Sequence, residues 1–223
     1  MTIYVINPNS SQHVTDGITR AVDPMRAMTP VAIEARTLAE GPPGIETQAH
    51  VDGVVTPLLA HCARLEDSAS AFVVACYSDP GLAALREQSA RPVLGIAEAS
   101  ILTAMTLGQR FGIVSILSRS IPRHMRYVGA MGVMDRLAAD MPLELGVLDL
   151  QDKTRTFERL KTVGAQLRDT AMADVIILGC AGMTAYRSEL EDHLGLPVVE
   201  PCQAAVAMAI GRVALQKTFK DRP

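Results

Sequence analysis

The order of short apolar runs and longer amphipathic stretches constrains the fold of this chain more than any other feature. Runs rich in β-branched residues alternate with stretches of helical periodicity, which is typical of a parallel sheet with crossover helices. Eight such runs predict strands in two sets of four: 3–6, 31–35, 71–76 and 93–96, then 111–116, 143–148, 174–179 and 197–199. The sequence therefore predicts an α/β fold.

The two halves of the chain repeat the same order of elements. Each has a strand, a helix, a strand, a helix and a third strand that ends on a cysteine, Cys76 in the first half and Cys180 in the second. No Gly/Pro/Ser-rich linker separates the halves, so we expect two tightly apposed, pseudo-symmetric flavodoxin-like lobes with the active site between them. The predicted first lobe spans 1–97 together with 203–223, and the second spans 98–202.

One predicted helix contains a proline that should interrupt it. Residues 47–66 have apolar side chains at intervals of three and four, which gather on one helical face. Pro57 within this stretch is expected to kink or split the helix. Further helices are predicted around residues 157–171 and 202–213.

The composition excludes several function classes. The formal net charge is only −3, and aromatic residues make up 4% of the chain, which disfavours nucleic acid and an anionic membrane as partners. No apolar run reaches the length of a membrane span, and the first strand is too short for a signal peptide. Four cysteines without paired spacing predict neither a disulfide framework nor a metal site. We expect a cytoplasmic protein with a small-molecule partner, and homo-oligomer formation is left open.

Four loops lie at the carboxyl ends of predicted strands, where ligands of parallel sheets collect. They are Asn7–Ser10, Cys76–Asp79, Ser115–Ser120 and Cys180–Met183. Since the loops are equivalent in the two halves, packing about a pseudo-twofold axis would make Cys76 and Cys180 face each other across one cleft. The backbone amides after Asn7 suit a carbonyl or carboxylate, although this segment could be a plain turn with a helix cap.

The surroundings of the two cysteines suit reactive thiols. Asp79 and Pro80 predict a helix start with Asp79 as its cap, and the partial positive charge of a helix N-terminus favours a thiolate at Cys76. Gly182 permits close backbone approach after Cys180, and Thr184 is expected to cap the next helix. Because a free thiol has a pKa of about 8.5, a modest decrease brings proton transfer into range near neutrality.

Simpler interpretations apply to several residues. A single cysteine at the end of a buried strand is usually a core residue, and only the pair at equivalent turns favours function. Cys62 and Cys202 are expected to pack in the core. The loop 41–44 is either a plain turn or the edge of a lid over the cleft. Surface or capping roles are expected for all five histidines, which lack ligand spacing: His13, His50, His61, His124 and His193.

Three motifs together resemble the aspartate/glutamate racemase superfamily, and specifically its hydantoin and allantoin racemase branch. They are VINPNSS at 5–11, VACYSDPGL at 74–82 and LGCAGM at 178–183, and the stretches 44–53 and 118–122 fit the same branch. The resemblance implies two pseudo-symmetric lobes, no metal, no pyridoxal phosphate or other cofactor, and one cysteine on each face of the substrate. It carries Cys76 and Cys180 over as the catalytic pair.

The resemblance also implies substrate contacts. They are Asn9, Ser10, Ser78, Ala181 and Gly182. The chain departs from the branch after the first cysteine, where Tyr77 and Ser78 replace the usual Phe and then Gly or Asp. A threonine common in the fifth-strand loop is replaced by Ile116, which leaves Ser115 or Ser118 to compensate, and Ser118 joins the predicted contacts.

These observations predict a cofactor-independent, two-cysteine racemase of a 5-substituted hydantoin or allantoin, in which one thiolate removes the α-proton and the opposite thiol returns one. No cation is conspicuous in the motif loops, which disfavours a dicarboxylate substrate. One alternative is an amino-acid racemase or a maleate-isomerase-like enzyme of the same superfamily; an amino-acid racemase should have an Arg or Lys in the cleft. Another is a non-catalytic small-molecule sensor, which would need neither thiol. Related decarboxylases keep only the second cysteine.

Overall fold

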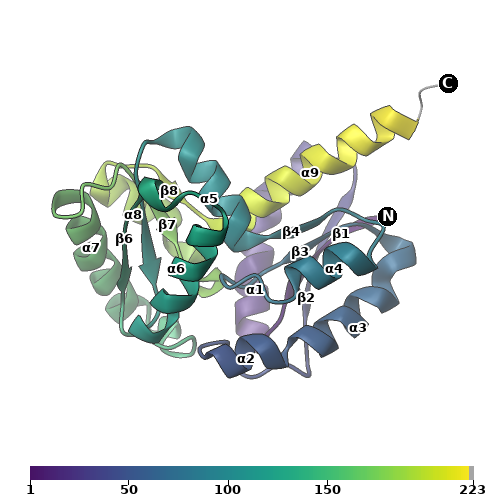
Figure 1. Cartoon of the computed structure of the whole chain (residues 1–223), viewed down its shortest axis with the longest axis horizontal. Helices are drawn as coiled ribbons and strands as arrows, with labels where there is room; N and C mark the ends of the chain where they lie inside the picture. Colours follow the sequence, from purple (N-terminus) through teal and green to yellow (C-terminus); the bar gives the residue numbers. More distant parts are fainter. Residues whose placement is uncertain (221–223) are drawn as a thin grey trace.

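The computed structural model describes residues 1–220, and it contains two four-stranded parallel sheets with the same strand order. The first sheet has the order β2-β1-β3-β4 and the second β6-β5-β7-β8 (Figure 1). The strands are β1 (Thr2–Asn7), β2 (Ala32–Thr37), β3 (Ala69–Val74), β4 (Val93–Gly95), β5 (Phe111–Ser115), β6 (Leu137–Pro142), β7 (Val175–Leu178) and β8 (Val198–Val199). The predicted α/β fold with two pseudo-symmetric parallel sheets is confirmed.

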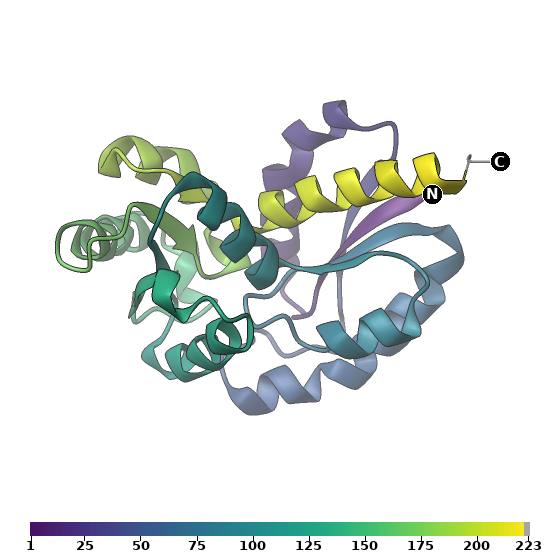
Figure 2. The ribbon, with the colours of Figure 1, turned by 45° about the horizontal axis from the view of Figure 1, so that its top comes forward.

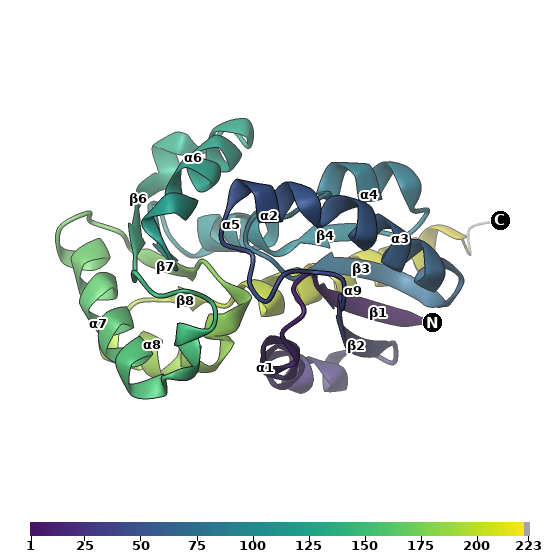
Figure 3. The same cartoon turned by 90° about the horizontal axis from the view of Figure 1, so that it is seen from below.

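Helices connect the strands and cover both faces of the first sheet. They are α1 (Gln12–Val22), α2 (Gln48–Gly53), α3 (Val55–Leu65), α4 (Leu82–Gln88), α5 (Ile96–Leu107), α6 (Ile121–Ala130), α7 (Lys153–Asp169), α8 (Arg187–Leu194) and α9 (Pro201–Lys220). Short 3-10 turns include η3 (Ser118–Ser120) and η6 (Ala181–Tyr186). Figure 3 shows α3 and α4 on one side of the first sheet, with α1 and α9 on the other.

The strands of the first sheet are buried on both faces, which explains their apolar sequences. Ile3 and Val5 of β1 belong to the core under α1 and α9, whereas Tyr4 and Ile6 belong to the core under α3 and α4. This alternation follows from the two-residue period of a strand.

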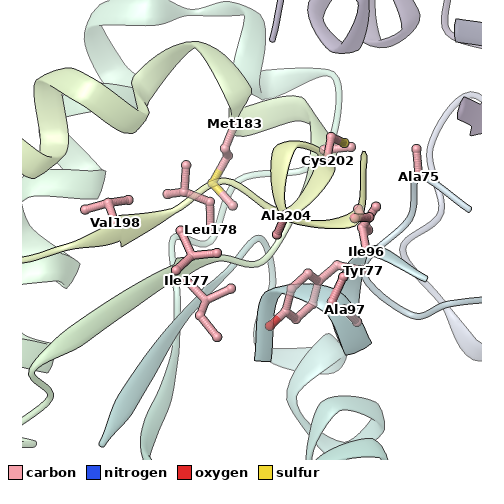
Figure 4. Close-up of a cluster of buried hydrophobic side chains, with 14 of the residues drawn as sticks. Ala75, Tyr77, Ile96, Ala97, Ile177, Leu178, Met183, Val198, Cys202 and Ala204 are labelled. Atoms are coloured by element: carbon pink, nitrogen blue, oxygen red, sulfur yellow. The ribbon is translucent and has the colours of Figure 1, made fainter. Parts of the chain in front are cut away.

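The two sheets share one continuous core. The larger cluster of buried side chains includes residues of both sheets and of α9, and α9 packs against α5, β3 and α1. Figure 4 shows Ala75 and Ile96 from the first half of the chain close to Cys202 of α9, with Leu178 and Met183 nearby. Figure 2 shows α9 leaving the middle of the molecule along the first sheet. The lobe boundaries at 97/98 and 202/203 stay a prediction, and residues 221–223 lie outside the described part.

The strand predicted at 143–148 is wrong, because the sixth strand is β6 at Leu137–Pro142. β6 lies at the edge of the second sheet, and its half-buried residues lack the apolar alternation of a typical strand. The segment after β6 has the alternating apolar pattern of a strand, because Leu143, Leu145 and Val147 are buried beyond the end of the sheet. Leu143 still donates its backbone N–H to Ser115 O at 2.8 Å, so the chain continues alongside β5 toward the site.

The helix predicted over 47–66 is split, as expected, into α2 and α3 at Val54. Pro57 lies in the first turn of α3, where a missing N–H leaves no helical hydrogen bond unmade. Within residues 1–220, no helix is long and apolar enough to cross a membrane.

Candidate active site

A narrow cavity lies between the two sheets at the carboxyl ends of their inner strands. Its volume is about 30 Å³, roughly the space of one water molecule. Cys76 and Cys180 both line it. The lining also includes Asn9, Val14, Ile45, Ala75, Tyr77, Ser78, Ile116, Ser120, Arg123, His124, Val147, Gly179, Ala181 and Gly182.

The two cysteines occupy equivalent positions just beyond β3 and β7. Gly179 is required before Cys180, since a Cβ there would lie 2.6 Å from Val114 O. The backbone N–H of Gly182 donates to the Cys180 sulfur at 3.3 Å. The backbone N–H of Ser78 is hydrogen-bonded to Cys76 in the same way and lowers the pKa of that thiol. Each sulfur therefore receives an amide from the residue two positions later.

Burial outweighs these amides and raises the pKa of both thiols. The pKa of Cys76 rises to about 12, and the nearby Cys180 and Asp79 contribute to the increase. The pKa of Cys180 rises to about 11, with Glu46 adding to the effect of burial. Both shifts are opposite to the modest decrease expected from the sequence. The thiols are therefore protonated at neutral pH in this structure.

Asp79 was predicted to cap the helix that follows Cys76, and this prediction is wrong. Helix α4 begins only at Leu82, after Gly81, so no helix N-terminus follows Cys76 directly. Asp79 instead accepts hydrogen bonds from the backbone N–H groups of Ala97 (3.0 Å) and Glu98 (2.9 Å) at the start of α5. It also accepts one from Tyr127 Oη of α6 at 2.8 Å. Asp79 thus links the Cys76 loop to α5 and α6, and burial raises its pKa to about 6.

The predicted capping role of Thr184 is also wrong. Cys180 itself occupies the N-cap position of η6, and α8 begins at Arg187 after Tyr186 with no side-chain cap. The chain makes a short 3-10 turn before α8, so Thr184 lies inside η6 rather than before a helix.

The structure brings four of the six predicted contact residues to the cavity. Asn9, Ser78, Ala181 and Gly182 line it. Ser10 lies outside the lining and donates its backbone N–H to Pro42 O at 3.0 Å. Ser118 is exposed in η3, and Ser120 at the other end of that turn lines the cavity instead.

The loop 41–44 packs closely against its surroundings. A Cβ on Gly41 would lie 2.2 Å from Pro8 O, and one on Gly44 would lie 2.8 Å from the Val147 side chain. Ile45 and Val147 both line the cavity. We call residues 41–46 the strap, since they join the loop after β1 to the segment that follows β6.

The surface or capping role predicted for His124 is wrong. Its side chain is buried, and its Nδ1 lies 2.7 Å from Asp140 Oδ2 and 3.1 Å from Ser115 Oγ. Ser115 Oγ also donates to Asp140 Oδ1, and the His124 ring packs edge-on against Tyr77 with centroids 5.1 Å apart. This polar cluster supports the second-sheet wall of the cavity.

No cation is conspicuous in the motif loops, but Arg123 of α6 lines the cavity. Its guanidinium donates to Ser120 Oγ (3.2 Å), to Glu46 O (3.3 Å) and to Arg119 O (3.3 Å). Its charge lowers the pKa of Cys76. The spacing of Ser120, Arg123, His124 and Tyr127 gives the signal that sequence reasoning missed, since these positions share one helical face.

In the part of the chain that the structure describes, no group of three or more His, Cys, Asp or Glu side chains could hold a metal ion. The two other cysteines, Cys62 and Cys202, are buried, as predicted.

The fold and this cavity define a two-lobed α/β protein in which each sheet supplies one thiol to a shared pocket. The model of the Asp/Glu/Hydantoin racemase family matches residues 3–209, and the chain belongs to this family.

Known relatives identify the branch of the family. The chain is 37% identical over 219 residues to a hydantoin racemase of Paenarthrobacter aurescens, covering 96% of this chain and 92% of the relative. Its structure matches the allantoin racemase from Klebsiella pneumoniae with a TM-score of 0.91 and 32% identity, covering 97% of this chain and 89% of that one. The allantoin racemase from Pseudomonas fluorescens gives a TM-score of 0.88 and 27% identity, with 97% and 92% covered. The chain is therefore an isomerase, a racemase of the hydantoin/allantoin branch.

Proposed function

We propose that this racemase inverts the stereocentre of a cyclic ureide, a 5-substituted hydantoin or allantoin, with Cys76 and Cys180 as its acid–base pair and without a cofactor. One observation carries the proposal: thiols at equivalent turns of the two sheets line one narrow cavity. The names of the relatives, hydantoin racemase and allantoin racemase, supply the substrate class.

The proposed reaction needs one thiolate and one thiol. The thiolate on one face of the ring takes the proton of C5, an S–H bond forms as the C–H bond breaks, and the electron pair moves into the adjacent carbonyl to give an enolate. The opposite thiol then donates its proton to C5 from the other face and becomes the thiolate. The enzyme ends with its two protonation states exchanged, ready for the opposite enantiomer.

The cavity offers donors for the enolate oxygen. The loops after the cysteines place Ser78, Ala181 and Gly182 on the cavity together with Asn9, and the amides of Ser78 and Gly182, which donate to the sulfurs without substrate, would have to turn to the enolate. Fixed amides that face a developing negative charge lower the barrier to carbanion formation. These four residues are the proposed substrate contacts; Ser120 is added because it lines the cavity, whereas contact by Ser10 or Ser118 stays a prediction.

A second candidate is racemisation of a free amino acid. The observation that favours it is Arg123, because an arginine in the cavity is the feature expected of an enzyme that binds a carboxylate. Enantiopure amino acids and enantiopure hydantoins, tested side by side with the same enzyme, separate the two candidates.

The two-thiol mechanism is tested with Cys76→Ser and Cys180→Ser. Each variant should lose racemisation, since one turnover needs a base and an opposing acid. Each should still exchange the C5 proton of one enantiomer in deuterium oxide, and the two variants should prefer opposite enantiomers. NMR follows proton loss and optical rotation follows racemisation, both after subtraction of the spontaneous rate.

Cys62→Ser is the matched control, because Cys62 is buried in α3 and does not line the cavity. A Cys76→Ser or Cys180→Ser variant that racemises at the wild-type rate would contradict the mechanism. Activity should also survive exhaustive chelation; loss with EDTA that zinc restores would contradict cofactor independence.

A further inference from the structure

A second cavity adjoins the two-thiol cavity. We call it the side chamber; its volume is about 240 Å³, and it lies between α2, α6 and the loop after Cys76. Four of its lining residues, Tyr77, Ser78, Arg123 and His124, also line the two-thiol cavity. These side chains form the boundary between the two cavities, so the side chamber is the space next to a ring held between the thiols.

The side chamber carries two cationic side chains from successive turns of α6, Arg123 and Arg126. Neither forms an ion pair with a carboxylate among the described residues. Arg126 donates to the neutral Gln48 Oε1 at 2.8 Å. The donors of Arg123 go to a hydroxyl and two carbonyls, and its buried Nε has no hydrogen-bond partner.

The nearby carboxylates are occupied elsewhere. Asp79 accepts three hydrogen bonds from Ala97, Glu98 and Tyr127. Glu46 pairs with Arg119 at 3.0 Å and accepts the Val147 N–H at 2.9 Å. Asp52 accepts a hydrogen bond from Gln48 Nε2 at 2.8 Å.

A partly buried guanidinium with an unused donor is costly unless a ligand supplies the acceptor. Burial lowers the pKa of Arg123, and the charges of Arg126 and Arg119 lower it further, whereas Cys76 and Asp52 act in the opposite direction. An anionic group in the side chamber would offset this repulsion and give the two guanidinium groups an acceptor of opposite charge. A carboxylate fits best, because its planar pair of oxygens matches the donors of a guanidinium.

We propose that the side chamber binds the substituent on the reacting carbon of the substrate, and that Arg123 and Arg126 select a substituent that ends in a carboxylate. This inference rests on the proposed function. In chemical terms, the preferred substrates are hydantoins with a short carboxyalkyl group at C5. Hydantoins with neutral alkyl, aryl or amide substituents of similar size are poorer substrates, because they leave Arg123 and Arg126 without an anionic partner.

The test compares two nearly isosteric substrates, 5-(2-carboxyethyl)hydantoin and 5-(2-carbamoylethyl)hydantoin. Wild-type enzyme should racemise the acid with a kcat/KM about tenfold or more above that of the amide, the scale of one charge-assisted hydrogen bond. In Arg123→Gln this ratio should fall to near one, and in Arg126→Gln it should fall by a smaller factor through a higher KM for the acid. The ratio is taken within each variant, so a general loss of rate does not affect it.

Arg155→Gln is the matched control, since Arg155 is exposed at the start of α7 and lines neither cavity. Its ratio should equal that of the wild type. Because Arg126 is exposed on α6, Arg126→Gln keeps the test open if Arg123→Gln does not fold.

The outcomes distinguish this inference from the proposed function. If the wild type racemises both hydantoins at the same rate, or if Arg123→Gln keeps the wild-type ratio, the side-chamber assignment is wrong while the two-thiol mechanism stands. If the wild type racemises no hydantoin and no allantoin, the proposed function itself is overturned.

Discussion

Cys76 and Cys180 are partly buried where the two sheets meet, and this burial raises their thiol pKa values to about 12 and about 11. The compensating contacts are weak. The helix that follows Cys76 starts only at Leu82, and Cys180 is followed by the short 3-10 turn η6; the field of a helix terminus fades within one turn. The thiolate form is therefore scarce at neutral pH, and the two sulfurs titrate as a coupled pair, because a charge on one opposes ionisation of the other.

These pKa values predict how the alkylation rate of the two cavity thiols depends on pH. Only a thiolate is alkylated, so the labelling rate by iodoacetamide should rise about tenfold per pH unit from pH 7 and level off near pH 11 for Cys180 and near pH 12 for Cys76. The sign follows from the direction of the shift: a raised pKa keeps the proton on sulfur until strongly alkaline pH. Mass spectrometry of each labelled cysteine gives the profile, and a plateau below pH 8 for either residue would show that its thiolate is stabilised in the cavity.

The sequence predicts the positions of some site residues but not of others. The placement of Cys76 and Cys180 on one cavity follows from the repeated strand pattern, because the carboxyl ends of equivalent strands meet between two like sheets. Arg123 and His124 were missed because the loop motifs drew attention to strand ends, whereas these residues lie on a helix. Their contacts with Glu46 and Asp140 come from distant segments that no local pattern connects.

Elements buried on both faces were predictable, and edge elements were not. The strands β1, β3, β5 and β7 have continuous apolar sequences because helices or the shared core cover them. The edge strand β6 is half-buried, so the buried segment after it was taken for the strand. The capping of a helix start was the other wrong prediction. Asp79 accepts backbone N–H groups at the start of α5, which begins later in the chain, and not at the start of the adjacent α4.

The start of α9 carries an ionisable group with a predictable effect on stability. Glu200 accepts the backbone N–H groups of Cys202 (3.0 Å) and Gln203 (2.6 Å), and burial raises its pKa to about 7. The folded state therefore binds this proton more tightly than the unfolded chain. The stability it contributes is fully present below about pH 4.5 and is lost as the pH rises to about 7.

We expect Glu200→Gln to remove this dependence. The difference in unfolding free energy between wild type and variant should change by up to about 3 kcal/mol between pH 4.5 and pH 8, with the wild type losing stability as the pH rises. Urea unfolding at several pH values measures it. Glu189→Gln on α8 is the control, because Glu189 is exposed there. Parallel pH profiles of wild type and Glu200→Gln would mean that Glu200 ionises normally.

At the scale of the whole molecule, the cavity depends on contacts between the two sheets. The shared core joins the two sheets, and Ile45 of the strap lines the cavity. Glu46 forms an ion pair with Arg119 and accepts the N–H of Val147, both from the second half of the chain. Since the cavity volume is only about 30 Å³, a substrate ring can enter only if parts of the lining move apart. We expect the strap to be the part that moves, in which case Glu46 links access to the cavity with the charge around Cys180.

Glu46→Gln tests this coupling with little change of shape. The amide keeps an acceptor for Val147 but loses the negative charge that raises the pKa of Cys180, so the alkylation profile of Cys180 should move to lower pH. The weaker strap should also raise KM, because the closed form that holds the substrate is less favoured. Global stability should change by less than about 1 kcal/mol, as is usual for a partly exposed ion pair. Glu158→Gln, which removes the exposed pair with Lys161 on α7, should alter none of these quantities. If Glu46→Gln leaves both the Cys180 profile and KM at wild-type values, the strap neither gates the cavity nor sets the charge of its second thiol.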